Sequence, residues 1–498
     1  MSAQTTLLAN FLQVGSIRST SASSILKKNI GDATISLVAW VLVGYALSDG
    51  KDQLRIVGGS YFGLVQGENS ILPVLVLTIC LRGGLSDALV ALGCRKWGAK
   101  DSFKVSGEPF EATDDRDVGT ALLECLFRWS FAATCTTIVS DAFLTSAVFY
   151  PLLAHAAWAD EGWASPFLTS EGESAAWLNC GVVDFAGSGV VHMLGGGIGL
   201  VLSMVVDNRS DRFIDANPQL VERNKSATLD RRLFKVSHNL LSRGRYGFNC
   251  GSTLQISTEE TRNAAGRAAL NTTIGAGENE HDKHELCYQR AGWAVGCVSS
   301  MGFEIMYHWW SPEYRRREFI NDPLDYMPQA RNTLAGELSS QDPRRRRTTG
   351  STDDAKDPED EHNSGKFRWR LSTHKSIHGA ACNGVLVGLV GVTAGCATMH
   401  PWHAIWVSIV SALVYHVSYR GIICCNIDDA INAAAVHLVG GLWGVVAAGL
   451  TVDNAARVDL GFPGQEDGCT PENQAWVNVL MAVIIFGYVS NNRTLYLG

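Results

Sequence analysis

Two histidines in apolar, glycine-rich segments are the residues of this chain best placed to do chemistry. His192 follows Asp184 by eight residues, and His437 follows Asp429 at the same spacing. A Gly-Gly-x-x-Gly run begins three residues after each histidine. Ionisable side chains inside a long apolar helix are costly in a membrane, so the repeated pair indicates a functional site.

The chemistry open to these residues follows from the donors and acceptors they carry. A neutral imidazole has one N–H donor and one acceptor nitrogen. Two imidazoles that share a hydrogen bond could line a narrow apolar pore and carry a small polar solute or a proton. A single histidine on an apolar helix face is usually a core residue, but two at matching places favour a site. The aspartates, about two helical turns earlier, could hold a cation or helix backbone by charge, or act only as helix caps.

The elements that must position these residues are membrane helices. A pattern repeated in two parts of one chain is typical of transporters built from inverted repeats, with the site between them. A membrane span needs roughly 20 largely apolar residues. Apolar stretches that approach this length lie near residues 35–47, 71–92, 118–144, 146–159, 177–206, 241–256, 291–310, 377–399, 402–419, 427–452 and 476–489. We predict an all-α, polytopic membrane protein with about 10–11 transmembrane helices in two inverted, pseudo-symmetric halves.

Charge and composition divide the chain into three segments. Residues 1–311 are predicted to form the N-terminal half of the transporter domain, with its first span largely missing, and residues 371–498 the remainder. Residues 312–370 combine proline, serine, arginine and acidic runs that cannot bury a core, so they are predicted to be disordered. Arginine clusters after a span mark the cytoplasmic side, so this segment is expected to be a cytoplasmic loop. A regulatory docking segment is the alternative.

Other features of the sequence exclude several classes of protein. The 13 cysteines are scattered without a C-x-x-C pair, so we expect neither a metal site nor a disulfide framework. No nucleophile–base set or phosphate-binding loop is evident, so we expect neither an enzyme nor a cofactor, and no nucleic-acid partner. Residues 257–287 occupy a place where a span is expected, yet they are polar.

One contiguous motif supports a family resemblance. The run Asp-Phe-Ala-Gly-Ser-Gly-Val-Val-His at residues 184–192 closely resembles the signature of the ammonium transporter family (Amt/Mep/Rh), and looks most like its plant and protist branch. Further matching stretches follow in family order, at residues 127–132, 246–252, 381–384, 401–402 and 427–429.

The resemblance implies a role for each matching residue. His192 and His437 would be the twin histidines of the pore. The residues implied to bind or recruit the substrate are Asp184, Trp158, Ser252, Phe127, Phe131 and Phe248. Aromatic faces attract a desolvated ammonium ion by up to about 2 kcal/mol, and a serine hydroxyl can accept one of its protons. Trp158 taken alone could equally be an anchor at the membrane interface.

The resemblance also implies a physiological setting. It implies movement of ammonium or ammonia through a hydrophobic pore for nitrogen uptake, by a homotrimer in a lipid bilayer, with the plasma membrane as the expected location. The alternatives are an ammonium sensor and a transport-inactive subunit of a mixed trimer.

The chain departs from the family pattern at two arginines. Arg128 stands where the family has glutamine, and Arg245 where it often has tryptophan. We expect both to face an interface, a water-filled vestibule or an acidic partner. Glu124 is the expected partner of Arg128, because residues four apart share a helix face. The cytoplasmic C-terminal tail of the family is also expected to be missing.

Overall fold

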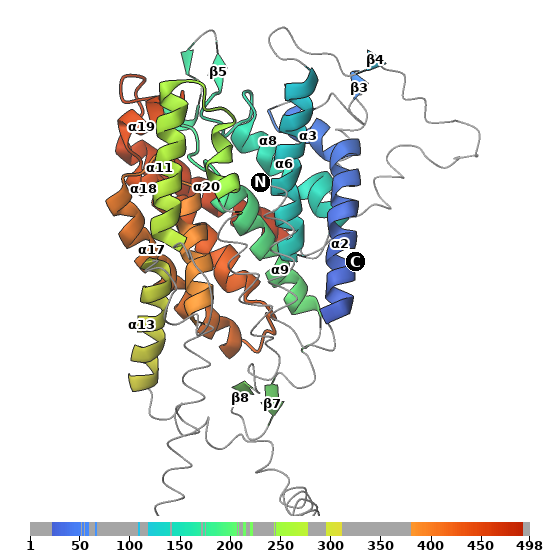
Figure 1. The fold of residues 1–498 in the computed structure, drawn as a ribbon, viewed down its shortest axis with the longest axis vertical. Coiled ribbons are helices and arrows are strands. Elements are labelled where there is room, and N and C mark those ends of the chain that lie inside the picture. Colours follow the sequence, from blue (N-terminus) through green and yellow to red (C-terminus); the bar gives the residue numbers. More distant parts are fainter. Residues whose placement is uncertain are drawn as a thin grey trace, which may run out of the picture.

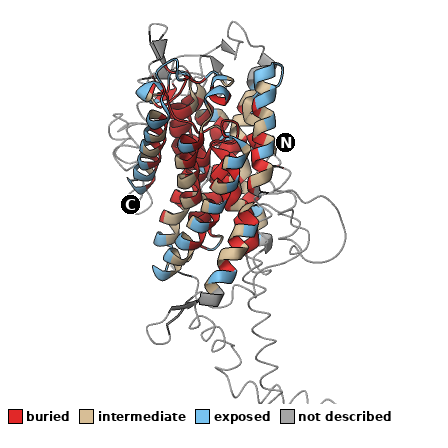
Figure 2. Ribbon diagram, turned by 90° about the vertical axis from the view of Figure 1, so that its left-hand side faces the viewer, coloured by how far each residue is buried: buried red, intermediate tan, exposed pale blue. Residues whose placement is uncertain are grey.

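A computed structural model describes most of the helical part of the chain. It describes residues 22–50, 118–139, 142–170, 176–206, 246–276, 295–310 and 380–491, and short pieces at 52–53, 55–58, 65–66, 108–109, 173–174, 208, 213–215, 220–222 and 244. The long helices stand side by side along one axis (Figure 1). Buried residues lie where helices face one another, and exposed ones lie on the outer helix faces (Figure 2).

The described residues contain six helices long and apolar enough to cross a membrane. Several join an α-helix to a π-helical turn: α2 (Ala22–Ala39), η2 (Trp40–Gly44) and α3 (Tyr45–Asp49); η6 (Ser188–Met193) and α9 (Leu194–Val205); η10 (Ala434–Val439) and α18 (Gly440–Thr451). The others are α6 (Val118–Val139), α17 (Pro401–Cys424) and α20 (Pro471–Asn491). These six helices make the chain a polytopic, all-α membrane protein, as predicted.

Shorter elements complete the described bundle. They are α7 (Ala142–Leu144), η4 (Thr145–Phe149), α8 (Tyr150–Trp158), η5 (Trp177–Asn179), η8 (Gly251–Thr253), α11 (Glu259–Ala276), α13 (Val295–Trp310), an apolar helix at Ala380–Thr393 and α19 (Asn454–Val458). The described strands form four two-stranded antiparallel ribbons. Their bounds are β1 (Asp52–Gln53), β2 (Val57–Gly58), β3 (Val65–Gln66), β4 (Glu108–Pro109), β5 (Thr169–Ser170), β6 (Glu173–Ser174), β7 (Phe213–Asp215) and β8 (Leu220–Glu222).

The two histidine-bearing helices cross in opposite directions. A Cβ added at Gly196, just after His192, would lie 2.2 Å from the backbone nitrogen of Leu438. A Cβ added at Gly441 would lie 2.4 Å from the carbonyl oxygen of Ser188. Later residues of each helix therefore pack on the earlier residues of the other, so the helices are antiparallel. This packing agrees with the predicted inverted halves, and it explains the repeated glycines, because only glycine permits such close backbone approach.

Two sequence-based boundaries need correction. The predicted spans 177–206 and 427–452 start too early, because their helices begin only at Ser188 and Ala434. Part of the polar segment 257–287 is helical, since α11 lies within it and buries Ala264 and Ala268. The predicted span at 71–92 and the loop at 312–370 lie outside the described residues.

The expectation of no disulfide is wrong. Cys180 and Cys469 form a disulfide across a sequence separation of 289 residues. It joins the segment that leads into η6 to the segment that precedes α20. Arg457 is buried beside it and donates to the carbonyl oxygen of Cys180 at 3.3 Å. Burial lowers the pKa of Arg457 to about 10, so the guanidinium stays charged at neutral pH.

Candidate functional site

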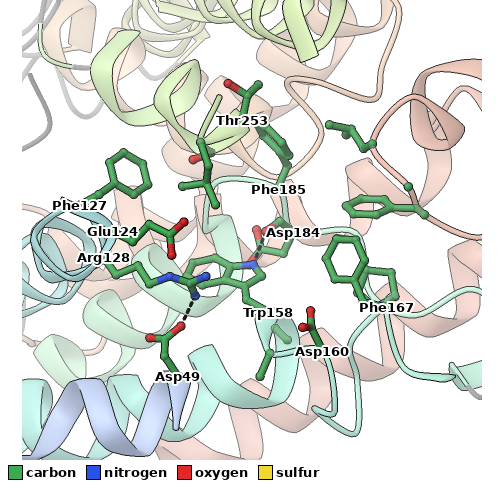
Figure 3. Close-up of a pocket in the computed structure, with 18 of the residues that line it drawn as sticks. Asp49, Glu124, Phe127, Arg128, Trp158, Asp160, Phe167, Asp184, Phe185 and Thr253 are labelled. Atoms are coloured by element: carbon green, nitrogen blue, oxygen red, sulfur yellow. Dashed lines mark hydrogen bonds and ion pairs between the residues drawn. The ribbon is translucent and has the colours of Figure 1, made fainter. Parts of the chain in front are cut away.

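A cavity of about 1250 Å³ lies among α3, α6, α8, η8 and the segments around Asp184 and Asp459 (Figure 3). We call this cavity the vestibule. Among the described residues that line it, seven are acidic and one is an arginine, Arg128. The acidic ones are Asp49, Glu124, Asp160, Glu161, Asp184, Glu260 and Asp459. A cleft lined by an excess of one sign of charge concentrates ions of the opposite sign. The vestibule is therefore suited to gather small cations.

Aromatic rings connect the vestibule to the histidines. Phe131 and Trp158 line the vestibule and meet edge to face, with ring centroids 5.8 Å apart. Phe248 stacks on Phe131 at 3.9 Å between centroids, and its ring centroid lies 6.1 Å from that of His192. Phe127 lies 5.0 Å from Phe131. The Phe131–Phe248 pair thus stands between the vestibule and the imidazoles, and both rings are buried.

The two imidazoles lie within direct hydrogen-bonding distance. The Nδ1 atoms of His192 and His437 are 3.2 Å apart, and the rings are inclined by 20° with centroids 5.2 Å apart. One Nδ1 must carry the proton and the other accept it. Each histidine lies in a π-helical turn, η6 or η10, a feature frequent at functional sites.

Asp184 fixes the start of the first histidine helix. Its carboxylate accepts hydrogen bonds from the backbone N–H groups of Gly187 at 3.1 Å and of Gly189 and Val190 at 2.9 Å. The indole N–H of Trp158 donates to the carbonyl oxygen of Asp184 at 2.8 Å. The structure therefore shows Asp184 in the helix-capping arrangement that was the alternative interpretation, on the wall of the vestibule.

Asp429 repeats this arrangement in the other half. Its two carboxylate oxygens accept from the backbone N–H groups of Ala433 and Ala434, each at 2.8 Å. Asp429 is also buried. Both aspartates thus satisfy N–H groups that a helix start leaves without intrahelical partners.

Ser252 stands on the vestibule wall in η8. Its hydroxyl donates to the carbonyl oxygen of Phe248 at 2.9 Å, so the oxygen keeps its capacity to accept a hydrogen bond. The neighbouring Gly251 packs against the Phe127 ring. The structure thus brings together all the residues predicted for the site: Asp184, His192, His437, Trp158, Ser252, Phe127, Phe131 and Phe248.

One pair in the vestibule was missed by the sequence analysis. Arg128 pairs through Nη1 with the Asp49 carboxylate at 2.6 Å, a partner that the sequence analysis did not name. Glu124 lies alongside in the same cavity (Figure 3). Asp49 is the last residue of α3, and only tertiary packing brings it to α6. The sequence feature that could have pointed to Asp49 is an acidic residue at the end of an apolar span. Arg245 lies outside the described residues.

Comparison with known proteins identifies relatives along most of the chain. Ammonium transporter 1 member 1 of Arabidopsis thaliana is 25% identical over 464 residues, covering 88% of this chain and 64% of the relative. The protein of the same name from Oryza sativa subsp. japonica is 26% identical, covering 96% of this chain and 74% of the relative. The matched region therefore spans a little less than two thirds of the Arabidopsis relative.

Solved structures share the fold. A structure titled "Sensor Amt Protein" is 18% identical with a TM-score of 0.60, covering 100% of this chain and 90% of that one. Mep2 of Saccharomyces cerevisiae is 15% identical with a TM-score of 0.58, covering 100% of this chain and 82% of that one. The family profile described as Ammonium Transporter Family matches residues 4–278 and 367–495, well over half of the sequence. The chain therefore belongs to the Ammonium Transporter Family.

Proposed function

We propose that this chain moves ammonium or ammonia across a membrane through a pore lined by His192 and His437. The observation that carries the proposal is the alignment of three features: an acidic vestibule, a buried aromatic pair and two imidazoles 3.2 Å apart. Membership of the Ammonium Transporter Family supports ammonium as the substrate.

Recruitment begins at the vestibule wall. The excess of acidic residues raises the local concentration of cations. An ammonium ion then meets the rings of Trp158 and Phe131 and donates a hydrogen bond to the Ser252 oxygen. Potassium can use the cation–π attraction but cannot donate hydrogen bonds, so the serine and the histidines favour ammonium.

Passage requires the side chains of Phe131 and Phe248 to move apart, because their ring centroids are only 3.9 Å apart. A charged ion is costly in the apolar space beyond, so ammonium leaves a proton with water on the vestibule side and crosses as ammonia. Ammonia can both donate to and accept from the neutral imidazoles, which together offer both kinds of group. The histidines thus replace the hydrogen bonds that ammonia loses with water.

Two features indicate the side of the membrane to which the vestibule opens. Disulfides form and persist in oxidising compartments, and the Cys180–Cys469 disulfide lies close to the vestibule residues Val182 and Asp184 in sequence. The helix α13 ends at Trp310, at the other end of the bundle (Figure 1), and the arginine-rich segment follows it. Basic loops are cytoplasmic. The vestibule therefore faces outward, which suits uptake at the plasma membrane.

The same proposal covers domain organisation and assembly. The family profile matches both sides of a break at residues 279–366, so residues 1–311 and 371–498 fit as two parts of one transporter domain. The intervening 312–370 remains a predicted cytoplasmic loop. A homotrimer is proposed from the family resemblance alone.

The test is uptake of labelled methylammonium by cells that lack their own ammonium carriers. We expect saturable uptake that ammonium inhibits and potassium does not. Surface labelling of the protein, with vector-only cells as control, shows that the chain reaches the membrane. Surface protein that binds ammonium without uptake would contradict transport and support the sensor alternative.

A further inference from the structure

We infer that Arg128 sets the affinity of the vestibule for ammonium, acting as a tethered cation that neutralises Asp49. The inference rests on the proposed function and adds a specificity-determining residue to it. It concerns a residue on the vestibule wall that no step of the proposed transport uses.

The geometry places the guanidinium where a free cation would bind. Arg128 Nη1 lies 2.6 Å from Asp49 Oδ1, and both side chains line the vestibule together with Trp158. Among the described residues, the buried second oxygen of Asp49 has no hydrogen-bond partner. Tyr45 and Tyr150 also line the cavity. A carboxylate beside aromatic rings is the composition of a cation site, and here the chain supplies the cation itself.

The pair is only partly removed from water. The Arg128 and Asp49 side chains are 23% and 12% exposed. Solvent therefore reaches the pair from the vestibule, so a soluble cation can compete with the guanidinium for Asp49. Figure 3 shows Arg128 reaching Asp49 beside Trp158, the residue proposed to hold the ammonium ion.

The charge that each substitution leaves on this pair determines whether cation binding becomes stronger or weaker. The intact pair contributes no net charge. Arg128→Gln leaves one negative charge in the vestibule and should strengthen cation binding. Asp49→Asn leaves one positive charge and should weaken it. The double variant is again neutral, and so is Arg128→Lys, which keeps the ion pair.

The experiment measures the KM for methylammonium uptake in these four variants. We expect KM to fall about three- to tenfold in Arg128→Gln and to rise by about as much in Asp49→Asn, as for a unit charge in a partly solvated site. The double variant and Arg128→Lys should stay near the wild-type value. The differences should shrink at high salt, because the vestibule is open to screening ions.

A second, partly buried ion pair provides a matched control. Arg420 on α17 pairs with Glu304 on α13 at 2.8 Å, with side-chain exposures of 22% and 7%. Arg420→Gln removes the same charge from a comparable pair, but neither residue lines the vestibule. It should lower surface abundance without changing KM.

A second readout separates this inference from the proposed function. Ammonium binding to each purified variant, measured as the concentration that gives half of the maximal rise in Tm, should follow the same order as KM. If wild type shows no uptake but binding keeps this order, the transport proposal fails and the inference stands. If Arg128→Gln and Asp49→Asn shift affinity in the same direction, or neither shifts it, the pair is only structural and the inference is wrong.

Discussion

The two Asp-x7-His segments share a backbone design and differ in their surroundings. In each, an aspartate accepts backbone N–H groups at a helix start, and the histidine lies in a π-helical turn. In each, glycines after the histidine allow the close crossing of the two helices. This common part places the imidazoles opposite one another.

The surroundings of the two aspartates are unlike. Asp184 lies on the wall of the large vestibule and holds Trp158 through its carbonyl oxygen. Asp429 lies beside Tyr419, Ile422 and Asn432, around a much smaller space. The repeat therefore duplicates the helix start and the histidine of the proposed pore but not the residues proposed to recruit the substrate, and variants in matched positions should separate the two.

The largest effect is expected at the aspartates. Asp184→Ala leaves three buried N–H groups without their acceptor, and Asp429→Ala leaves two. Each unsatisfied buried donor costs about 1–3 kcal/mol, so both variants should lower Tm, Asp184→Ala more than Asp429→Ala. Only Asp184→Ala should also disturb Trp158 and raise the KM for uptake.

The measurements are Tm of the purified variants in detergent and methylammonium uptake normalised to surface protein. The variants Asp184→Asn and Asp429→Asn serve as controls. Each keeps one acceptor oxygen, so its Tm should fall less than that of the alanine variant. An equal rise in KM for both alanine variants would mean that the two surroundings are functionally alike.

An intermediate effect is expected at the histidines. His192→Ala with His437→Ala removes both polar groups behind the Phe131–Phe248 pair, so ammonia would cross without replacement hydrogen bonds. Uptake should fall about tenfold, equivalent to a barrier higher by about 1.4 kcal/mol, with little change in Tm. The single variants should resemble each other, because the imidazoles form one hydrogen-bonded pair.

Uptake of labelled methylammonium with potassium as competitor checks this prediction. Matching rate and selectivity in wild type and the double variant, at equal surface expression, would rule out the assignment of the pore to these histidines.

The smallest effect is expected at Trp158. Trp158→Leu removes the π face from the vestibule, so discrimination of ammonium over potassium should weaken by a few fold, about 1 kcal/mol or less at a site open to water. Trp443 is the matched control, because its indole N–H also donates to a backbone carbonyl, that of Val407 at 3.0 Å, away from the vestibule.

The readout is methylammonium uptake over a range of potassium concentrations. Trp158→Leu should become sensitive to potassium and Trp443→Leu should not. An equal loss of discrimination against potassium in both variants would mean that the effect comes from packing rather than from cation recognition.

The sequence by itself determined the class of protein and predicted the residues that we propose for the pore. The motif at residues 184–192 is contiguous, and the repeated Asp-x7-His spacing lies along single helices, so both can be read without knowing how helices pack. Long apolar stretches indicated the membrane for the same reason. The structure then placed His192 opposite His437.

Tertiary structure alone decided the partners that come from distant segments. The rule of residues four apart considers only one helix and selected Glu124, whereas packing of α3 against α6 brings Asp49 to Arg128. The disulfide between Cys180 and Cys469 was missed likewise, because nothing in cysteine spacing reveals which loops meet across 289 residues. Local sequence patterns determine which residues share one helix. Pairs of charges or of thiols depend on which helices and loops become neighbours, and only packing of the whole bundle decides that.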